Sequence, residues 1–255
     1  MKVNKRTVEP ARAASTGPQA RAVAALWDEK RRATRGPRPG LDVAAIAGAA
    51  IAIADAEGIE AVSMQRVAAR LGYTTMALYR HLPGKPELLD QMIEAAVGEP
   101  PVIAADLEWR AGLDAWARAL SAAFHHHPWL LGASMRLRIM GPRELRWMDR
   151  ALALFAGTGL SAAETHQAFL ALLGQVHSAT RFSLPPGAGR GVSGEQWVTA
   201  TRSVLREHGE GYPALRAVMA AGAFQTTRGD GLTFALRCVL DGIGVLVAQR
   251  TAPER

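Results

Sequence analysis

The hydrophobic pattern between residues 42 and 98 predicts four helices. Asp42 is the predicted N-cap of the first helix. Gly58 marks its predicted end, because glycine readily adopts the left-handed conformation that often follows the last turn of a helix. Pro86 is favoured in the first turn of a helix, so a fourth helix is predicted from there to about Val97. The apolar residues of the first helix recur at three- and four-residue steps: Val43, Ile46, Ala47, Ala50, Ile53 and Ala54.

Two short helices are predicted between these two. Ser63 caps one that ends at Gly72, and Thr74 caps the next, which runs to about Leu82. Short helices joined by a tight turn with glycine are typical of a helix-turn-helix, whose second helix enters the major groove of DNA. Apolar Leu78 and Leu82 should anchor that second helix to the core.

Beyond residue 101, segments with apolar residues at helical spacing are separated by Gly and Pro. No segment shows the alternating apolar and polar residues of a strand. The fold class is therefore predicted as all-α, with a helix-turn-helix domain over 41–98 and a larger helical bundle over 99–255. Residues 1–40 are predicted to be a basic flexible arm, because their prolines and glycines interrupt any long apolar period. The helices expected in the bundle span 105–127, 128–138, 142–156, 161–182, 195–208, 212–222 and 230–250.

The net charge of +7 lies entirely in the arm. Residues 1–40 hold ten Lys and Arg against three acids, whereas the other 215 residues are balanced. Within the balanced part, residues 61–86 contain four cations and no acid. A basic arm followed by an acid-free basic window indicates a surface that binds a polyanion.

The remaining composition excludes several classes of protein. One cysteine cannot form an intramolecular disulfide, and Cys238 in its apolar helical run is expected to be buried. No charge-free apolar stretch reaches the length of a membrane span, and the N-terminus lacks a signal-peptide core, so a cytoplasmic location is expected. Neither G-x-S-x-G, H-E-x-x-H nor a phosphate loop occurs, which argues against an enzyme.

The segment over residues 49–89, AAIAIADAEGIEAVSMQRVAARLGYTTMALYRHLPGKPELL, resembles the DNA-binding domain of the TetR family of transcriptional regulators. Residues 35–40, RGPRPG, resemble the arm of a subgroup of that family. Sparser motifs after His127 and Phe234 resemble the tetracycline-repressor type of regulatory domain. The resemblance implies a homodimer that binds double-stranded operator DNA and a small-molecule effector, with no cofactor.

The resemblance also implies which residues contact DNA. Lys85 matches a position that contacts phosphate, and Arg80 is the best candidate for a bidentate contact to guanine. Arg35 and Arg38 of the arm can enter a narrow minor groove. The other predicted contacts lie at the starts of the two short helices and on the recognition surface: Ser63, Met64, Gln65, Thr74, Thr75, Met76, Ala77, Tyr79 and His81.

Bulky residues gather between 109 and 182. Each alone fits a packed core, but together with polar neighbours they fit an apolar ligand cavity with a few orienting groups. The predicted ligand-binding residues are Trp116, Phe124, Trp129, Met135, Trp147, Phe169, Gln175 and His177.

Three consecutive histidines, His125 to His127, invite a metal hypothesis. Consecutive helical residues point about 100° apart, so the three cannot chelate one ion together. They are better explained as histidines near the negative end of a helix dipole, and no metal site is predicted.

These patterns predict a ligand-responsive regulator, with repression the favoured mode, that binds a palindromic operator as a homodimer. A constitutive DNA-binding protein without an effector and a helical-bundle enzyme are the alternatives. Helices 161–182 and 230–250 are expected to form the dimer interface. The helix from Pro86 to Val97 is the only segment that joins the helix-turn-helix domain to the regulatory domain. It is therefore expected to transmit the effector signal, through residues such as Met92 and Ile93.

Overall fold

The computed structural model describes residues 26–27, 41–104, 106–136, 138–184, 194–223 and 231–251. These residues form helices, turns and linkers without a strand, which confirms the all-α prediction. Arg35, Arg38 and most of the predicted arm lie outside the described residues, while Leu26 and Trp27 are helical. Residues 40–255 form one compact unit.

The first group of helices begins with a capped α3. The side chain of Asp42 accepts a hydrogen bond from the Ala45 N–H at 2.7 Å, and Gly58, with φ of 88°, follows the last turn. The buried face of α3 packs against α6, and Ile46, Leu88 and Met92 are all fully buried there. The elements are α3 (Val43–Glu57), η1 (Ile59–Ala61), α4 (Met64–Leu71), α5 (Thr75–Tyr79) and α6 (Lys85–Val97).

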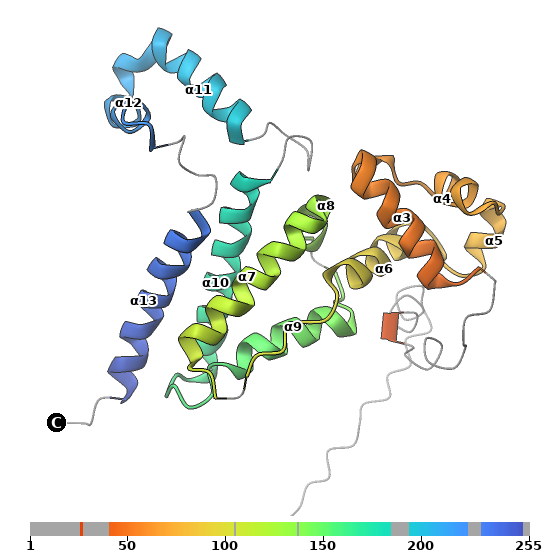
Figure 1. The fold of residues 1–255 in the computed structure, drawn as a ribbon, viewed down its shortest axis with the longest axis horizontal. Coiled ribbons are helices and arrows are strands. Elements are labelled where there is room, and N and C mark those ends of the chain that lie inside the picture. The colour runs from red at the N-terminus through yellow and green to blue at the C-terminus, as the bar shows by residue number, and fades with distance from the viewer. Residues whose placement is uncertain are drawn as a thin grey trace, which may run out of the picture. The chain divides into compact units, whose positions relative to one another are not determined.

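Most of the remaining helices form the bundle seen beside this group in Figure 1. Ser161 and Glu164 form a reciprocal cap at the start of its longest helix, with side-chain to main-chain hydrogen bonds of 3.3 Å and 2.9 Å. That helix, α10, packs along both α7 and α13. The elements are α7 (Trp109–His126), α8 (Pro128–Ser134), α9 (Pro142–Ala153), α10 (Ala162–Ser183), α11 (Gly194–His208), η2 (Gly209–Gly211), α12 (Pro213–Ala220) and α13 (Gly231–Thr251).

Several local predictions are wrong. The third helix ends at Tyr79 rather than near Leu82, and α7 begins at Trp109 rather than near residue 105. α8 ends at Ser134 rather than near residue 138, and α9 ends at Ala153 rather than near residue 156. Cys238 is exposed, not buried. The apolar residues of α13 extend over more of its surface than its neighbours cover, so the apolar run did not identify which side of the helix faces the core.

The same helix is the one described segment long and apolar enough to cross a membrane by length and composition. It carries Arg237, Asp241 and Arg250, and its Leu236, Leu240 and Ile243 are buried against the bundle. Only 22% of its most apolar window is buried, however, so a large apolar surface of α13 is left uncovered.

Candidate nucleic-acid interface

The helix-turn-helix is fixed by local hydrogen bonds at each turn. The Ser63 hydroxyl accepts from the Arg66 N–H at 3.2 Å and begins α4. Gly72 adopts the left-handed conformation with φ of 73°, and its N–H bonds back to α4. The Thr74 hydroxyl accepts from the Ala77 N–H at 3.3 Å and begins α5. The predicted caps at Ser63 and Thr74 are therefore confirmed.

α5 is anchored on one side and open on the other. Leu78 and Leu82 are fully buried, as predicted. Met76 is 69% exposed and Tyr79 45% exposed, and both Arg80 and His81 are exposed as well. Thr75 and Ala77 are partly exposed. Most of the side chains predicted to face DNA thus lie on the surface of this helix and the turn after it.

The cations of this region differ in their partners. Arg66 donates to Glu57 Oε1 on α3 at 2.5 Å, and this bond raises the pKa of Arg66 and lowers that of the Glu57 carboxyl. Among the described residues, Arg70, Arg80 and Lys85 have no hydrogen-bonding or ion-pair partner. Three of the four cations are consequently available to phosphate or to base edges.

One predicted residue, Met64, has a different environment. Met64 is only 6% exposed and belongs to the core, so its side chain cannot reach a groove, although its main-chain N–H lies in the first turn of α4. Gln65 beside it is exposed. Lys85 begins α6 after Gly84 and is exposed, as a phosphate contact requires.

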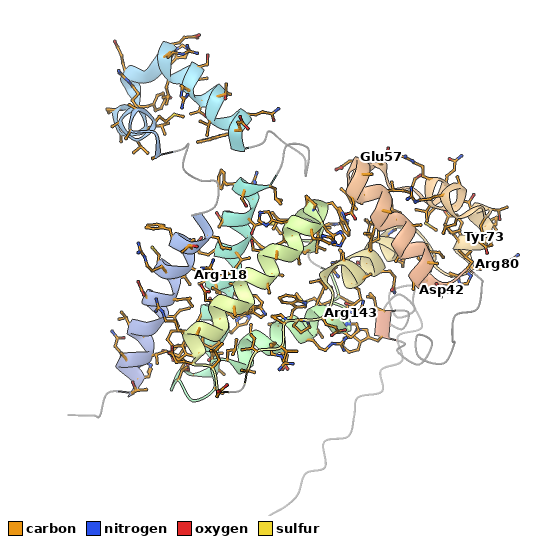
Figure 2. All side chains as sticks on the ribbon, viewed as in Figure 1. Asp42, Glu57, Tyr73, Arg80, Arg118 and Arg143 are labelled. Carbon is orange, nitrogen blue, oxygen red and sulfur yellow. The ribbon has the colours of Figure 1, made fainter. Side chains whose placement is uncertain are left out.

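The sequence analysis missed Tyr73. It lies in the turn between α4 and α5 and is 45% exposed. Figure 2 shows Tyr73 and Arg80 at the same end of this group of helices, beside α5. Its position directly after Gly72, in the turn of the predicted helix-turn-helix, is the signal that could have identified it.

Most of the predicted ligand residues belong to a packed aromatic core. The Trp116 ring meets those of Trp147 and Phe169 edge-on, with centroids 6.0 Å and 5.9 Å apart. Its indole N–H donates to the Trp147 carbonyl oxygen at 2.9 Å. Phe124 lies against His177, and burial lowers the pKa of that imidazole.

The other predicted ligand residues differ in their burial. Met135 is 65% exposed after the end of α8, and Gln175 is partly exposed on α10. Trp129 is buried, and its indole N–H donates to Asp55 on α3. The eight predicted residues therefore do not share one environment.

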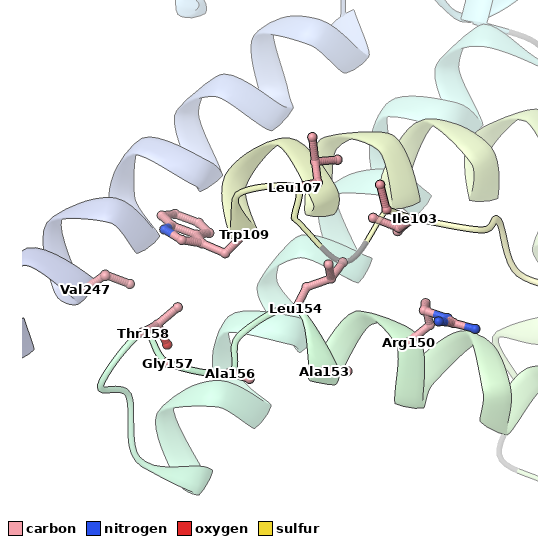
Figure 3. A pocket seen from close by; sticks show the side chains of 11 residues that line it. Ile103, Leu107, Trp109, Arg150, Ala153, Leu154, Ala156, Gly157, Thr158 and Val247 are labelled. Carbon is pink, nitrogen blue, oxygen red and sulfur yellow. The ribbon is translucent and has the colours of Figure 1, made fainter.

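A cavity of about 540 Å³ lies elsewhere, at the end of the bundle near the N-terminus of α7. Ile103 and Leu107 of the segment before α7 line it, with Trp109 at the start of that helix. α13 contributes Val247, and the end of α9 and the turn after it contribute six residues (Figure 3): Arg150, Ala153, Leu154, Ala156, Gly157 and Thr158. None of the eight predicted ligand residues borders it.

α6 is bonded to α9 along its C-terminal end. The Arg143 main-chain N–H donates to Glu94 Oε1 at 2.8 Å, and its guanidinium donates to Glu99 at 3.0 Å. Arg146 also donates to Glu99 at 3.0 Å, and the two arginines hold the pKa of that carboxyl below its usual range. The indole of Trp147 donates to a carbonyl oxygen just past α6 at 3.1 Å. The first turns of α9 thus hold the end of the helix that follows the helix-turn-helix.

His125 and His127 contact different partners. His125 bonds to the Ser121 carbonyl oxygen and to Ser183, and His127 bonds to Asp55 of α3. Among the described residues no group of three or more His, Cys, Asp or Glu side chains could hold a metal ion.

Comparisons with known proteins agree with this geometry. The family model described as bacterial regulatory proteins, tetR family, matches residues 46–92, and that of the tetracyclin repressor-like C-terminal domain matches residues 104–247. The chain is 39% identical over 247 residues to the HTH-type transcriptional repressor DrrR1 of Streptomyces coeruleorubidus, which covers 92% of this chain and 89% of the relative. It is 28% identical over 211 residues to an HTH-type transcriptional regulator of Saccharopolyspora erythraea, over 81% and 84% of the two chains.

The fold also has solved counterparts. The Streptomyces coelicolor TetR family protein ActR, in complex with (S)-DNPA, is similar with a TM-score of 0.65. The likeness covers 82% of this chain and 99% of the ActR chain at 24% identity, so it concerns the fold.

Proposed function

Because the chain belongs to the TetR family of bacterial regulatory proteins, we propose that it is a ligand-responsive repressor acting in the cytoplasm. In this proposal a homodimer binds a palindromic operator, and a small apolar or amphipathic effector releases it. The observation that carries the DNA-binding part is the exposed surface formed by α5 and the residues after it, where Arg80 and Lys85 lie without acidic partners among the described residues.

The dimer is supported by the uncovered face of α13. Its Phe234, Val245 and Leu246 are 61%, 57% and 42% exposed, and Leu170 on the adjacent α10 is 42% exposed. Apolar surface of this extent on two packed helices is stabilised when a second copy covers it. A Cβ at Gly242 of α13 would meet no atom within 4 Å, so the backbone there is open to close approach by another helix.

The effector is supported by the fold relative. ActR has been solved with (S)-DNPA and with actinorhodin, and the latter structure matches this chain with a TM-score of 0.65. We extend ligand binding from that protein to this chain, and place the effector among the helices from α7 to α10. DrrR1 is a transcriptional repressor, which supports repression here.

Electrophoretic mobility shift of the full chain on DNA from upstream of its own gene tests the proposal. Retention of that DNA at concentrations that leave a scrambled duplex free supports sequence-specific binding, and light scattering at micromolar protein should give the mass of a dimer. Equal binding to both duplexes, or a monomer mass, would contradict it. A thermal-shift screen with a mobility shift for each stabilising compound separates a ligand-responsive repressor from a constitutive DNA-binding protein.

A further inference from the structure

We propose that the cavity at the end of α9 binds an amphipathic organic anion, an apolar ring or chain that carries a carboxylate. This inference rests on the proposed function, because it names the site and the chemical class of the effector. The volume of about 540 Å³ lies within the range of small-molecule sites.

The chemistry of the lining selects the class. Trp109, Leu154 and Val247 supply aromatic and aliphatic surface for the body of the ligand. Among the described residues, Arg150 is the only charged side chain in the lining, and it has no partner there. Figure 3 shows Arg150 at one side of the cavity and Val247 at the other. A ligand with an apolar body and a terminal carboxylate satisfies both sides, since a guanidinium binds a carboxylate with charge-assisted hydrogen bonds.

The cavity wall is held in place by close packing. A Cβ at Gly112 of α7 would lie 2.6 Å from the Leu154 side chain, so the glycine is what allows this leucine to pack so near the helix. Thr158 is buried and its hydroxyl donates to the Phe155 carbonyl oxygen at 2.6 Å, while Gly157 turns the chain with φ of 77°. These contacts fix the turn after α9 before any ligand arrives, which lowers the entropic cost of binding.

The position of the cavity connects it to the DNA-binding helices. α9 has 12 residues and is therefore about 18 Å long. Its first turns hold Glu94 and Glu99 at the end of α6, and its last turn lines the cavity. Ile103 on the opposite wall follows α6 by a few residues. A ligand between these two walls changes the spacing of two segments that are both attached to α6.

Calorimetric titration of the full chain with 2-naphthoate and with neutral 2-naphthylmethanol tests the site. Arg150→Ala should weaken 2-naphthoate binding by roughly tenfold or more and leave the alcohol unaffected. Arg202→Ala removes the same charge from an exposed position on α11, outside the cavity, and should change neither titration. Ala153→Phe narrows the cavity from the end of α9 and should reduce binding of both probes. Val247→Phe narrows the cavity from α13. It replaces Ala153→Phe as the test if that variant lowers the melting temperature.

Each other result overturns the inference. Absence of 2-naphthoate binding removes the site, and binding that survives both Phe variants places the ligand elsewhere, the aromatic core around Trp116 included. An equal effect of Arg150→Ala on acid and alcohol removes the anion preference. Mobility shifts on operator DNA keep the two proposals apart, because failure to bind the operator contradicts the regulator while the titrations still decide the cavity.

Discussion

The carboxylate of Asp55 on α3 accepts a hydrogen bond from the indole Nε1 of Trp129 on α8, at 2.7 Å across 74 positions of sequence. The same oxygen, Oδ1, lies 2.8 Å from His127 Nδ1. The group of helices that carries the DNA-binding surface is therefore attached to the bundle at a second point besides α6. The helix from Pro86 to Val97 is the covalent link between the two groups, and the Asp55 hydrogen bond adds a non-covalent one. Any change in the position of α3 relative to α8 must either break this hydrogen bond or move the two side chains together.

Asp55→Ala should destabilise the protein through Trp129. The tryptophan is 3% exposed, so its N–H loses an acceptor that water cannot easily replace, at about 1–3 kcal/mol. The urea midpoint, with the m-value held equal, measures this loss. Asp149→Ala removes an exposed carboxylate on α9 that has no partner among the described residues and should leave the midpoint unchanged. Identical midpoints for both variants would mean that the Asp55 bond contributes nothing.

Arg80→Ala and Lys85→Ala should weaken DNA binding in different ways. Loss of a bidentate contact to guanine costs about 1–3 kcal/mol and relaxes the preference at one base pair. Loss of a phosphate contact at Lys85 should weaken operator and random DNA alike and reduce the salt dependence. Fluorescence anisotropy on both duplexes at several salt concentrations measures this. Arg118→Ala removes a cation outside the helix-turn-helix, on α7 beside Asp114, and is the control variant. Equal losses on both duplexes for Arg80→Ala would remove that residue from base recognition.

How much the sequence could predict follows from the range of each interaction. Asp42, Ser63 and Thr74 cap helices through bonds to residues three positions away, so their sequence context alone identified them. The Asp55–Trp129 bond joins distant segments, and no local pattern signals it. The cavity is similar, because Ile103 and Val247 of its lining meet only through the tertiary fold.

The aromatic core shows a second reason why the sequence could not predict the whole site. Trp116 and Phe169 were predicted beside a ligand cavity because bulky apolar and polar residues gather in the same segments of sequence. The same composition also suits dense packing, and the edge-on contacts show that these rings fill the space between their helices. Composition indicates where large side chains collect, whereas only the packing shows whether a void is left between them.

His177 should make stability depend on pH. Burial against Phe124 lowers the pKa of its imidazole, so the unfolded chain binds the proton more readily than the folded chain does. The stabilising contribution of the neutral ring is complete above the unfolded value near 6.5 and is lost as the pH falls through the lower folded value. Urea midpoints at pH 7.5 and pH 5 should therefore differ less for His177→Gln than for the unmodified protein. His166→Gln, at an exposed position on the same helix, should keep the full difference.

Transmission of the effector signal from the bundle to the helix-turn-helix is better tested at Glu99 than inside α6. Met92 and Ile93 are 0% and 2% exposed, so their replacement by Ala leaves cavities that cost about 2–5 kcal/mol and obscure a change in signalling. Glu99 instead bonds to Arg143 and Arg146 at the surface, where such pairs contribute about 0–1 kcal/mol to stability.

Glu99→Gln should leave the melting temperature nearly unchanged and reduce the effector response. With weaker bonds between α6 and α9, a ligand at the far end of α9 loses part of its influence on α6, and the coupling free energy falls. The ratio of operator Kd values with and without saturating 2-naphthoate measures that coupling, while calorimetry shows whether 2-naphthoate binding itself is preserved. Glu210→Gln in η2, an exposed carboxylate remote from both helices in sequence, is the matched control. An unchanged ratio for Glu99→Gln would show that the signal does not pass through this pair of helices.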